Sequence, residues 1–166
     1  MYRSKARERK TVNLGNVNVF RDWSHVEDII NGYILLSERS RYGDCYVFGS
    51  MRTNSVLTYV LLTLKELGYE ILRIETLNKR ISINNPIDVD NESFFGIKFE
   101  KTLVDNMLLK GEIEFSLEDE GIKIYTNKGS ILIKFDKERF RPVDVLILLS
   151  YPKKAKEKLK WEPEKP

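Results

Sequence analysis

The sequence F-R-D-W-S-H-V-E-D-I-I, from Phe20 to Ile30, is the stretch around which the rest of the chain can be arranged. Apolar residues recur at helical spacing in its second half and beyond, which predicts a helix that starts close to Ser24. Arg21 and Asp22 would then lie just before the helix N-terminus. Backbone N–H groups and a guanidinium at such a place suit an anion. A surface ion pair between Arg21 and a neighbouring acid is the simpler alternative.

The composition indicates an ordinary globular protein. The chain has 166 residues, of which 42% are hydrophobic and 32% charged, with a net charge of +3. This length is enough for one domain with a real core, so we expect a single domain over residues 1–166. One His and one Cys cannot form a conventional zinc site, and a lone Cys fits a reducing cytoplasm. No apolar run is long enough to cross a membrane, and we expect a cytoplasmic protein.

Basic residues gather at the two ends of the chain. They are Arg3, Lys5, Arg7, Arg9 and Lys10, followed at the other end by Lys153, Lys154, Lys156, Lys158 and Lys160. Such tails can contact nucleic acid, but no aromatic residues are interleaved with them, and a solvated helix face explains them as well. We therefore do not expect nucleic acid as a partner.

The first half of the chain alternates between helix and strand patterns. We expect a helix over 25–38, a short buried strand over 45–48, a helix from Asn54 or Ser55 to Gly68, and a strand over 70–75. Cys45 would then be a small buried hydrophobe rather than a nucleophile. This alternation favours a layered α/β arrangement.

The second half predicts a mixture of elements. Residues 77–95 are expected to be mostly loop, and a short helix over 102–110 should close at Gly111. Alternating apolar residues predict a small antiparallel meander over 112–135. The apolar run 145–149 predicts a strand, and Pro152 opens a lysine-rich helix in which Ala155 and Leu159 face inward. The expected fold is mixed α/β with about four helices and without a complete Rossmann fold.

Three separated pieces of the chain carry a family resemblance. They are Leu14–Asn16 with Arg21–Asp28, then Arg139–Asp144, then Pro152–Trp161. In this order they resemble the C-terminal, substrate-side part of the extended short-chain dehydrogenase/reductases that act on nucleotide sugars. The best match is the GDP-mannose 4,6-dehydratase type, within the NAD-dependent epimerase/dehydratase enzymes. The resemblance covers about residues 11–70 and 135–163, and the segment 71–134 would be an enlarged insertion.

The resemblance implies four substrate-binding residues. Arg21 would contact the diphosphate of a nucleotide sugar, Arg141 the diphosphate or the ribose, and Asp144 the ribose hydroxyls. Trp23 would pack beside the nucleotide, or else belong to the core. The chemistry agrees, because guanidinium groups bind phosphate oxygens bidentately and a carboxylate accepts hydrogen bonds from a diol.

The catalytic residues of these enzymes have no counterpart in the 166 residues. No G-x-x-G-x-x-G or G-x-G-x-x-G turn occurs, and no tyrosine has a lysine four positions after it. The chain departs from the family pattern at two further places: Ser150-Tyr151 stands where Gly-Asp is usual, and Lys160-Trp161 where Gly-Trp is usual. In the first case Ser150 could serve as a helix cap, and in the second a side chain occupies a place where Gly adopts the left-handed conformation freely.

We therefore expect the substrate-side half of a nucleotide-sugar dehydratase or epimerase, truncated or split. This chain alone is not expected to be an enzyme or to bind a cofactor, since NAD(P) would belong to the related full-length enzymes. Its partner would be a separate Rossmann-domain chain. The alternatives are a homo-oligomeric assembly module that has lost ligand binding, and a stand-alone binder of nucleotide diphosphates. His25 and Asp28 are expected to be structural caps or pairs rather than catalytic residues.

Overall fold

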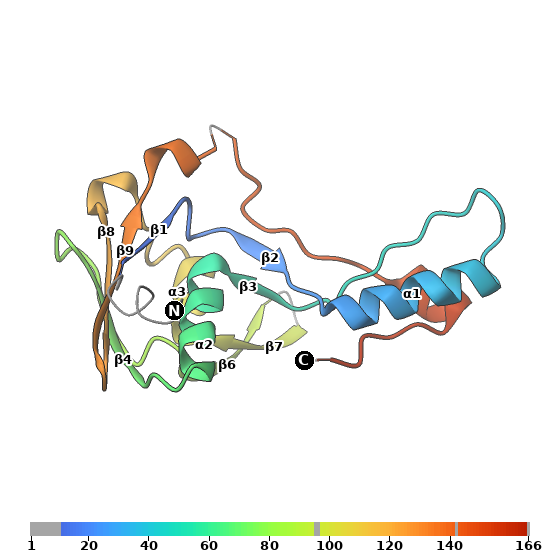
Figure 1. The fold of residues 1–166 in the computed structure, drawn as a ribbon, viewed down its shortest axis with the longest axis horizontal. Coiled ribbons are helices and arrows are strands. Elements are labelled where there is room, and N and C mark those ends of the chain that lie inside the picture. Colours follow the sequence, from blue (N-terminus) through green and yellow to red (C-terminus); the bar gives the residue numbers. More distant parts are fainter. Residues whose placement is uncertain (1–10, 95–96, 142, 166) are drawn as a thin grey trace, which may run out of the picture. The chain divides into compact units, whose positions relative to one another are not determined.

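The structure, a computed structural model, describes residues 11–94, 97–141 and 143–165 (Figure 1). They form two compact units. Unit 1 contains the chain up to Val19 together with Ser55–Asp144, and unit 2 contains Phe20–Asn54 and the chain from Val145 onward. The single domain expected from chain length stays a prediction.

A five-stranded sheet forms the centre of unit 1. Its strands are β1 (Thr11–Leu14), β9 (Gly129–Phe135), β8 (Gly121–Thr126), β4 (Ile71–Thr76) and β5 (Ser82–Asn84), in this spatial order. β1 runs parallel to β9, and the remaining neighbours are antiparallel. A separate antiparallel pair consists of β6 (Val89–Phe94) and β7 (Ile97–Thr102). The chain is therefore a mixed α/β protein, as the sequence predicts.

β-Branched residues opposite one another build the core of unit 1. Ile74 lies opposite Ile83 on one neighbouring strand and opposite Ile124 on the other, and Ile124 in turn lies opposite Ile131. Ile74 and Ile124 are fully buried. Such cross-strand pairs stabilise a sheet through close side-chain packing.

Two helices, α2 (Val56–Glu66) and α3 (Leu103–Leu109), lie on the same side of this sheet (Figure 1). Leu57 and Leu61 of α2 and Val104 of α3 belong to the same buried cluster as the sheet isoleucines. Side-chain hydroxyls of Ser55 and Thr102 cap the two helices by accepting from backbone N–H groups three residues later. These starts and the closure after α3 confirm the helices predicted from the sequence.

Unit 2 contains one long helix and a short C-terminal one. α1 (Val26–Arg39) begins after the N-cap His25, whose ring accepts from the N–H of Glu27. The π-helix η3 (Ala155–Leu159) packs beside α1 (Figure 1). Ala155, Leu159 and Trp161 form a buried cluster against Phe48 and two leucines of α1. β2 (Phe20–Asp22) pairs with β3 (Thr53–Ser55).

Several predicted strands are absent from the described residues. Residues 45–48 and 145–149 belong to no strand, and in the second run only Ile147 forms an isolated bridge, to Phe20. Cys45 is exposed, so its predicted burial is wrong. The predicted meander is only a β8–β9 hairpin, which joins the large sheet. Phe115, which the sequence predicts to lie in the meander, bonds a side chain instead. Its backbone N–H donates to the side-chain oxygen of Asn18 at 2.9 Å, and its C=O accepts from the side-chain nitrogen of Asn18 at 2.7 Å.

The remaining elements are three-residue 3-10 turns in unit 1. They are η1 (Leu117–Asp119) and η2 (Lys137–Arg139). Of the helices in the described ranges, none is both long enough and apolar enough to span a bilayer.

Candidate functional site

The carboxylate of Asp22 joins three segments of unit 2. One oxygen accepts from the N–H and the hydroxyl of Ser50, at 3.0 and 2.6 Å. The other accepts from the N–H of Met51 at 3.0 Å, and from the N–H of Ser150 at 3.1 Å and its hydroxyl. Burial would raise the pKa of Asp22, but the bonds from Ser150 and Ser50 outweigh it and hold that pKa below its ordinary value. Asp22 is thus a charged acceptor that fixes the backbone, and sequence reasoning missed this role.

Gly49 allows these segments to approach. A Cβ atom at this position would lie 2.1 Å from the Ser150 hydroxyl oxygen and 3.1 Å from an Asp22 oxygen. No side chain fits there. Met51, two residues later, has a positive φ of 57°, and its N–H donates to Asp22. The sequence offers Ser150 as an alternative cap for the following helix, but its hydroxyl donates to Asp22.

Arg21 lies beside this cluster and contacts the backbone. Its Nη1 donates to the carbonyl oxygens of Phe20 and Val145, each at 2.8 Å. The Val145 contact orients the guanidinium along the segment that follows Asp144. The side chain is only half-buried, so a solvent-borne anion can reach this part of unit 2.

Trp23 is 40% exposed and does not belong to the core. Its indole N–H donates to the carbonyl of Asn54 at 3.4 Å. A partly exposed indole two residues after Arg21 is a side chain of the kind that stacks on a nucleobase. Asp28, expected to be structural, accepts from the backbone N–H groups of Glu164 and Lys165, each at 3.1 Å.

A hollow of about 190 Å³ is lined in part by residues of the Asp22 cluster. Its lining includes Gly49, Ser50, Met51 and Trp161. Lys156 and Glu162 form an ion pair of 2.6 Å at its edge. The hollow is small, and its paired charges leave it no net preference for an anion.

Arg141 and Asp144 belong to unit 1, whereas Arg21 and Trp23 belong to unit 2. Arg141 is exposed, and Asp144 is half-buried and makes a polar interaction. Within unit 1 the chain just before them is anchored, because Arg139 Nη1 donates to the carbonyl of Asn13 and Nε to Asp136. The role that the resemblance assigns to these two residues remains a prediction.

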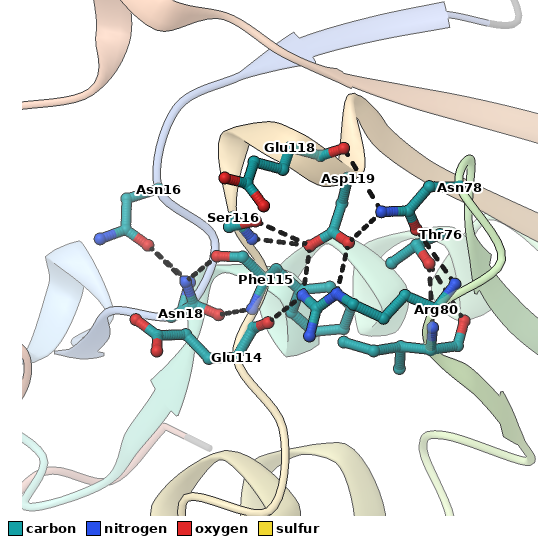
Figure 2. Close-up of polar contacts among 11 residues, drawn as sticks. Asn16, Asn18, Thr76, Asn78, Arg80, Glu114, Phe115, Ser116, Glu118 and Asp119 are labelled. Carbon is teal, nitrogen blue, oxygen red and sulfur yellow. Dashed lines mark hydrogen bonds and ion pairs between the residues drawn. The ribbon is translucent and has the colours of Figure 1, made fainter.

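A second ionic cluster in unit 1 surrounds the buried carboxylate of Asp119. Figure 2 shows the Arg80 guanidinium reaching both of its oxygens, with Nε–O and Nη2–O distances of 2.9 and 2.6 Å. The Ser116 N–H and the Asn78 amide also donate to it. Burial would raise the pKa of Asp119, but these donors, Arg80 first, lower it. Every oxygen is occupied by protein donors, so the cluster holds turns together.

A third charged group connects α3 to α2. The side chain of Asp105 is fully buried and accepts from the Thr58 hydroxyl at 2.7 Å and the Ser55 N–H at 3.3 Å. Burial raises the pKa of Asp105 in spite of these bonds. Burial also lowers the pKa of Lys101, against the attraction of Asp105. Because the pair is enclosed by protein, it has no access to a substrate.

The described residues contain no cluster of three or more metal-ligating side chains. The carboxylates of Asp22, Asp105 and Asp119 are thus bonded within the protein, while Arg21 is half-buried and Trp23 is 40% exposed in unit 2.

Comparison with known proteins identifies the family of this chain. A family model described as GDP-mannose 4,6 dehydratase matches residues 1–115, which is more than half of the chain. The chain belongs to the GDP-mannose 4,6-dehydratase family. The match includes Arg21 and Trp23 and ends before Arg141. It also enters the segment 71–134, whose description as an enlarged insertion stays a prediction.

Curated members of the family match almost the whole chain. The GDP-mannose 4,6 dehydratase of Dictyostelium discoideum is 29% identical over 90% of this chain and 30% of its own length. The GDP-mannose 4,6-dehydratases of Yersinia enterocolitica and Vibrio cholerae are 25% and 26% identical over 91% and 93% of this chain. These two matches cover 32% and 33% of the relatives. The chain therefore spans about a third of their length.

A solved structure, that of RMD from Pseudomonas aeruginosa complexed with NADPH, also resembles this chain. The TM-score is 0.50 at 12% sequence identity, over 98% of this chain and 33% of the other. At this identity the likeness concerns the fold alone.

Proposed function

We propose that these residues form the nucleotide-sugar-binding side of a GDP-mannose 4,6-dehydratase-like or epimerase-like enzyme and that they do not catalyse the reaction alone. Family membership supports the ligand class. The lack of a Gly-rich turn and of a Tyr–Lys pair in the 166 residues supports the second half of the proposal. A dinucleotide-binding part, on the same or on another polypeptide, would supply the chemistry.

The observation that carries the proposal is the exposed apolar surface of unit 2. Residues 145–149 read V-L-I-L-L, and each is 42–58% exposed. α1 presents Val26, Ile30, Tyr33 and Ile34 at helical spacing, all of them more than half exposed, while its other face packs on η3. An apolar surface of this kind in a globular domain marks a missing partner. Since the family relatives are three times longer, their dinucleotide-binding part is the occupant that we propose.

Within this proposal, Arg21 contacts the diphosphate and Trp23 packs beside the nucleotide. The backbone contacts of Arg21 orient its guanidinium before any ligand arrives, which reduces the entropy lost on binding. Arg141 and Asp144 would complete the contacts to the diphosphate and ribose. No residue of the chain is proposed as catalytic.

Calorimetry tests ligand binding. Titration of GDP and GDP-mannose into the protein should give heat, and Arg21→Gln should weaken binding by about 10-fold or more, as expected for a charge-assisted phosphate contact. Arg52→Gln is a matched control, because Arg52 is exposed in the same unit. The absence of heat for the unchanged protein with either ligand would exclude binding by this chain alone.

Mixing tests the partner. Dinucleotide-binding chains from the same cell should form a complex with this protein and restore NADP-dependent dehydration of GDP-mannose. Leu146→Glu with Leu148→Glu should abolish the complex, because charges are placed in the apolar run. Leu72→Glu, a leucine of similar exposure in unit 1, is the control. If neither complex nor activity forms, the split-enzyme proposal fails.

A further inference from the structure

A second hollow in unit 2, of about 550 Å³, is lined by basic and aromatic side chains. They are Arg39, Arg41, Tyr42, Tyr46, Lys154 and Lys158. Arg39 is the last residue of α1, the tyrosines belong to the loop that follows, and the lysines come from the C-terminal helix. We call it the basic–aromatic hollow. Its volume is in the range of ligand-binding pockets.

The C-terminal lysines divide between two faces of their helix. Lys153 and Lys156 lie near glutamates, with Nζ–O distances of 3.9 Å to Glu157 and 2.6 Å to Glu162. Lys154 and Lys158, four residues apart, line the hollow. Part of the lysine run is therefore not simply a solvated face, because Lys154 and Lys158 line the same hollow as Arg39 and Arg41.

Lys154 and Arg39 make contacts within the protein that hold the lining of the hollow in place. Lys154 donates to Asp44 at 2.7 Å and lies 4.5 Å from the ring centre of Tyr46. Arg39 donates to the carbonyl of Leu159 at 2.7 Å. The first contact holds the loop at Tyr46 against the C-terminal helix, and the second holds the end of that helix against the end of α1. Asp44 is the single acid among the lining residues, so the hollow keeps an excess of positive charge.

The other two cations are available to a ligand. Within the described part of the chain, the side chains of Arg41 and Lys158 make no hydrogen bond or ion pair. Tyr42, which follows Arg41, is fully exposed, and its ring can stack. Guanidinium and ammonium groups bind phosphate, and an exposed ring binds the face of any nucleobase.

We propose that the basic–aromatic hollow binds a nucleotide unit, with its phosphate on Arg41 and Lys158 and its base stacked on Tyr42. The sequence alone does not predict this site, because its basic tails lack interleaved aromatics. Folding supplies them by bringing the loop at Asp44 against Lys154, 110 residues later. The ligand is either a free nucleotide or one nucleotide of a single strand. The hollow shares no residue with Arg21, Trp23, Arg141 or Asp144, so it does not depend on the proposed nucleotide-sugar site.

Binding of a fluorescently labelled ten-residue oligoadenylate, measured by anisotropy between low and moderate salt, tests the proposal. Arg41→Gln and Lys158→Gln should each weaken binding and reduce the slope of log affinity against log salt by about 0.7. Tyr42→Ala should weaken binding by about 5- to 150-fold without changing that slope. Lys153→Gln, which makes the same charge change on the same helix outside the hollow, should leave both quantities unchanged.

Competition with AMP identifies the source of the nucleotide. Displacement of the decamer by AMP at comparable concentration assigns a free nucleotide, and resistance to AMP assigns a single strand. The proposal is overturned if neither probe binds at low salt, or if Lys153→Gln weakens binding as much as Lys158→Gln. Circular dichroism controls for folding, and all four substituted side chains are exposed, so no loss of structure is expected.

Discussion

Asp22 accepts hydrogen bonds from both the backbone N–H and the hydroxyl of Ser150, a residue 128 positions further along the chain. The same carboxylate also holds Ser50 and Met51. Arg21 immediately precedes it, so whatever fixes Asp22 also fixes the proposed diphosphate contact. The hydrogen bonds to Asp22 therefore support both the stability of unit 2 and the proposed ligand contact of Arg21.

Asp22→Asn should lower the free energy of unfolding of unit 2 by about 2 kcal/mol, because an amide nitrogen would face backbone donors. The folded pKa of Asp22 lies below its ordinary value of 3.8, so its contribution is complete above 3.8 and is lost as pH falls through the folded value. Urea unfolding followed by tryptophan fluorescence measures both effects, since both tryptophans lie in unit 2. Glu38→Gln, an exposed control on α1, should change neither.

Gly49→Ala should destabilise unit 2 by about 1–3 kcal/mol, because the added methyl group overlaps the short side chain of Ser150. The double variant with Ser150→Gly should regain part of the loss, since the overlapping atoms are gone. Gly43→Ala is a comparison of a different kind: no atom lies within 4 Å, and only its positive φ costs about 1 kcal/mol. Equal losses at both glycines would show that close approach is unimportant at Gly49.

The sequence was informative where structure is local. α1, α2 and α3 follow from apolar periodicity and from the caps His25, Ser55 and Thr102, because each signal acts within one helical turn. The apolar run 145–149 predicted a strand, but a strand needs a neighbour, and among the described residues its one bridge is to Phe20. The ring of donors around Asp22 had no local signal at all, since Ser50 and Ser150 become its neighbours only on folding.

Arg80→Gln should destabilise unit 1 by about 2–3 kcal/mol, because the buried carboxylate of Asp119 loses its counter-charge. The pKa of Asp119 should then rise, and acid unfolding should begin at higher pH. The stability that this group contributes is present above its ordinary pKa and is lost as pH falls through the lowered folded value. Stability measured by denaturant against pH checks the shift; Lys79→Gln, an exposed residue in the same turn, is the control.

Lys101→Met should destabilise unit 1 by about 3 kcal/mol, because it leaves the Asp105 carboxylate buried without a cation. The double variant with Asp105→Asn should be more stable than Lys101→Met alone, since no buried charge remains. The raised folded pKa of Asp105 means that its cost is relieved as pH falls through that value, and Asp105→Asn should remove this dependence. Lys134→Met, at an exposed site, should be close to neutral. Additive losses in the double variant would contradict the coupling.

Lys160 ends the C-terminal helix in the left-handed conformation, with φ 59° and ψ 34°. The resemblance implies Gly at this position, where Gly adopts the left-handed conformation freely. A side chain in this conformation costs about 1–2 kcal/mol, and the greater freedom of Gly in the unfolded chain offsets part of that. Lys160→Gly should therefore raise the free energy of unfolding by about 0.5–1 kcal/mol.

The matched substitution Lys158→Gly, within the same helix, should lower the free energy of unfolding by about 1 kcal/mol, because Gly is a poor helix former. The stability of Lys160→Asn should fall between that of the unchanged protein and that of Lys160→Gly, since Asn tolerates the left-handed region better than Lys. Thermal unfolding followed by tryptophan fluorescence measures these stabilities, because both tryptophans lie in unit 2 and one of them, Trp161, follows Lys160 and is buried against Phe48 at a ring distance of 5.0 Å. A loss of stability in Lys160→Gly would mean that contacts of the lysine side chain, rather than backbone strain, decide this position.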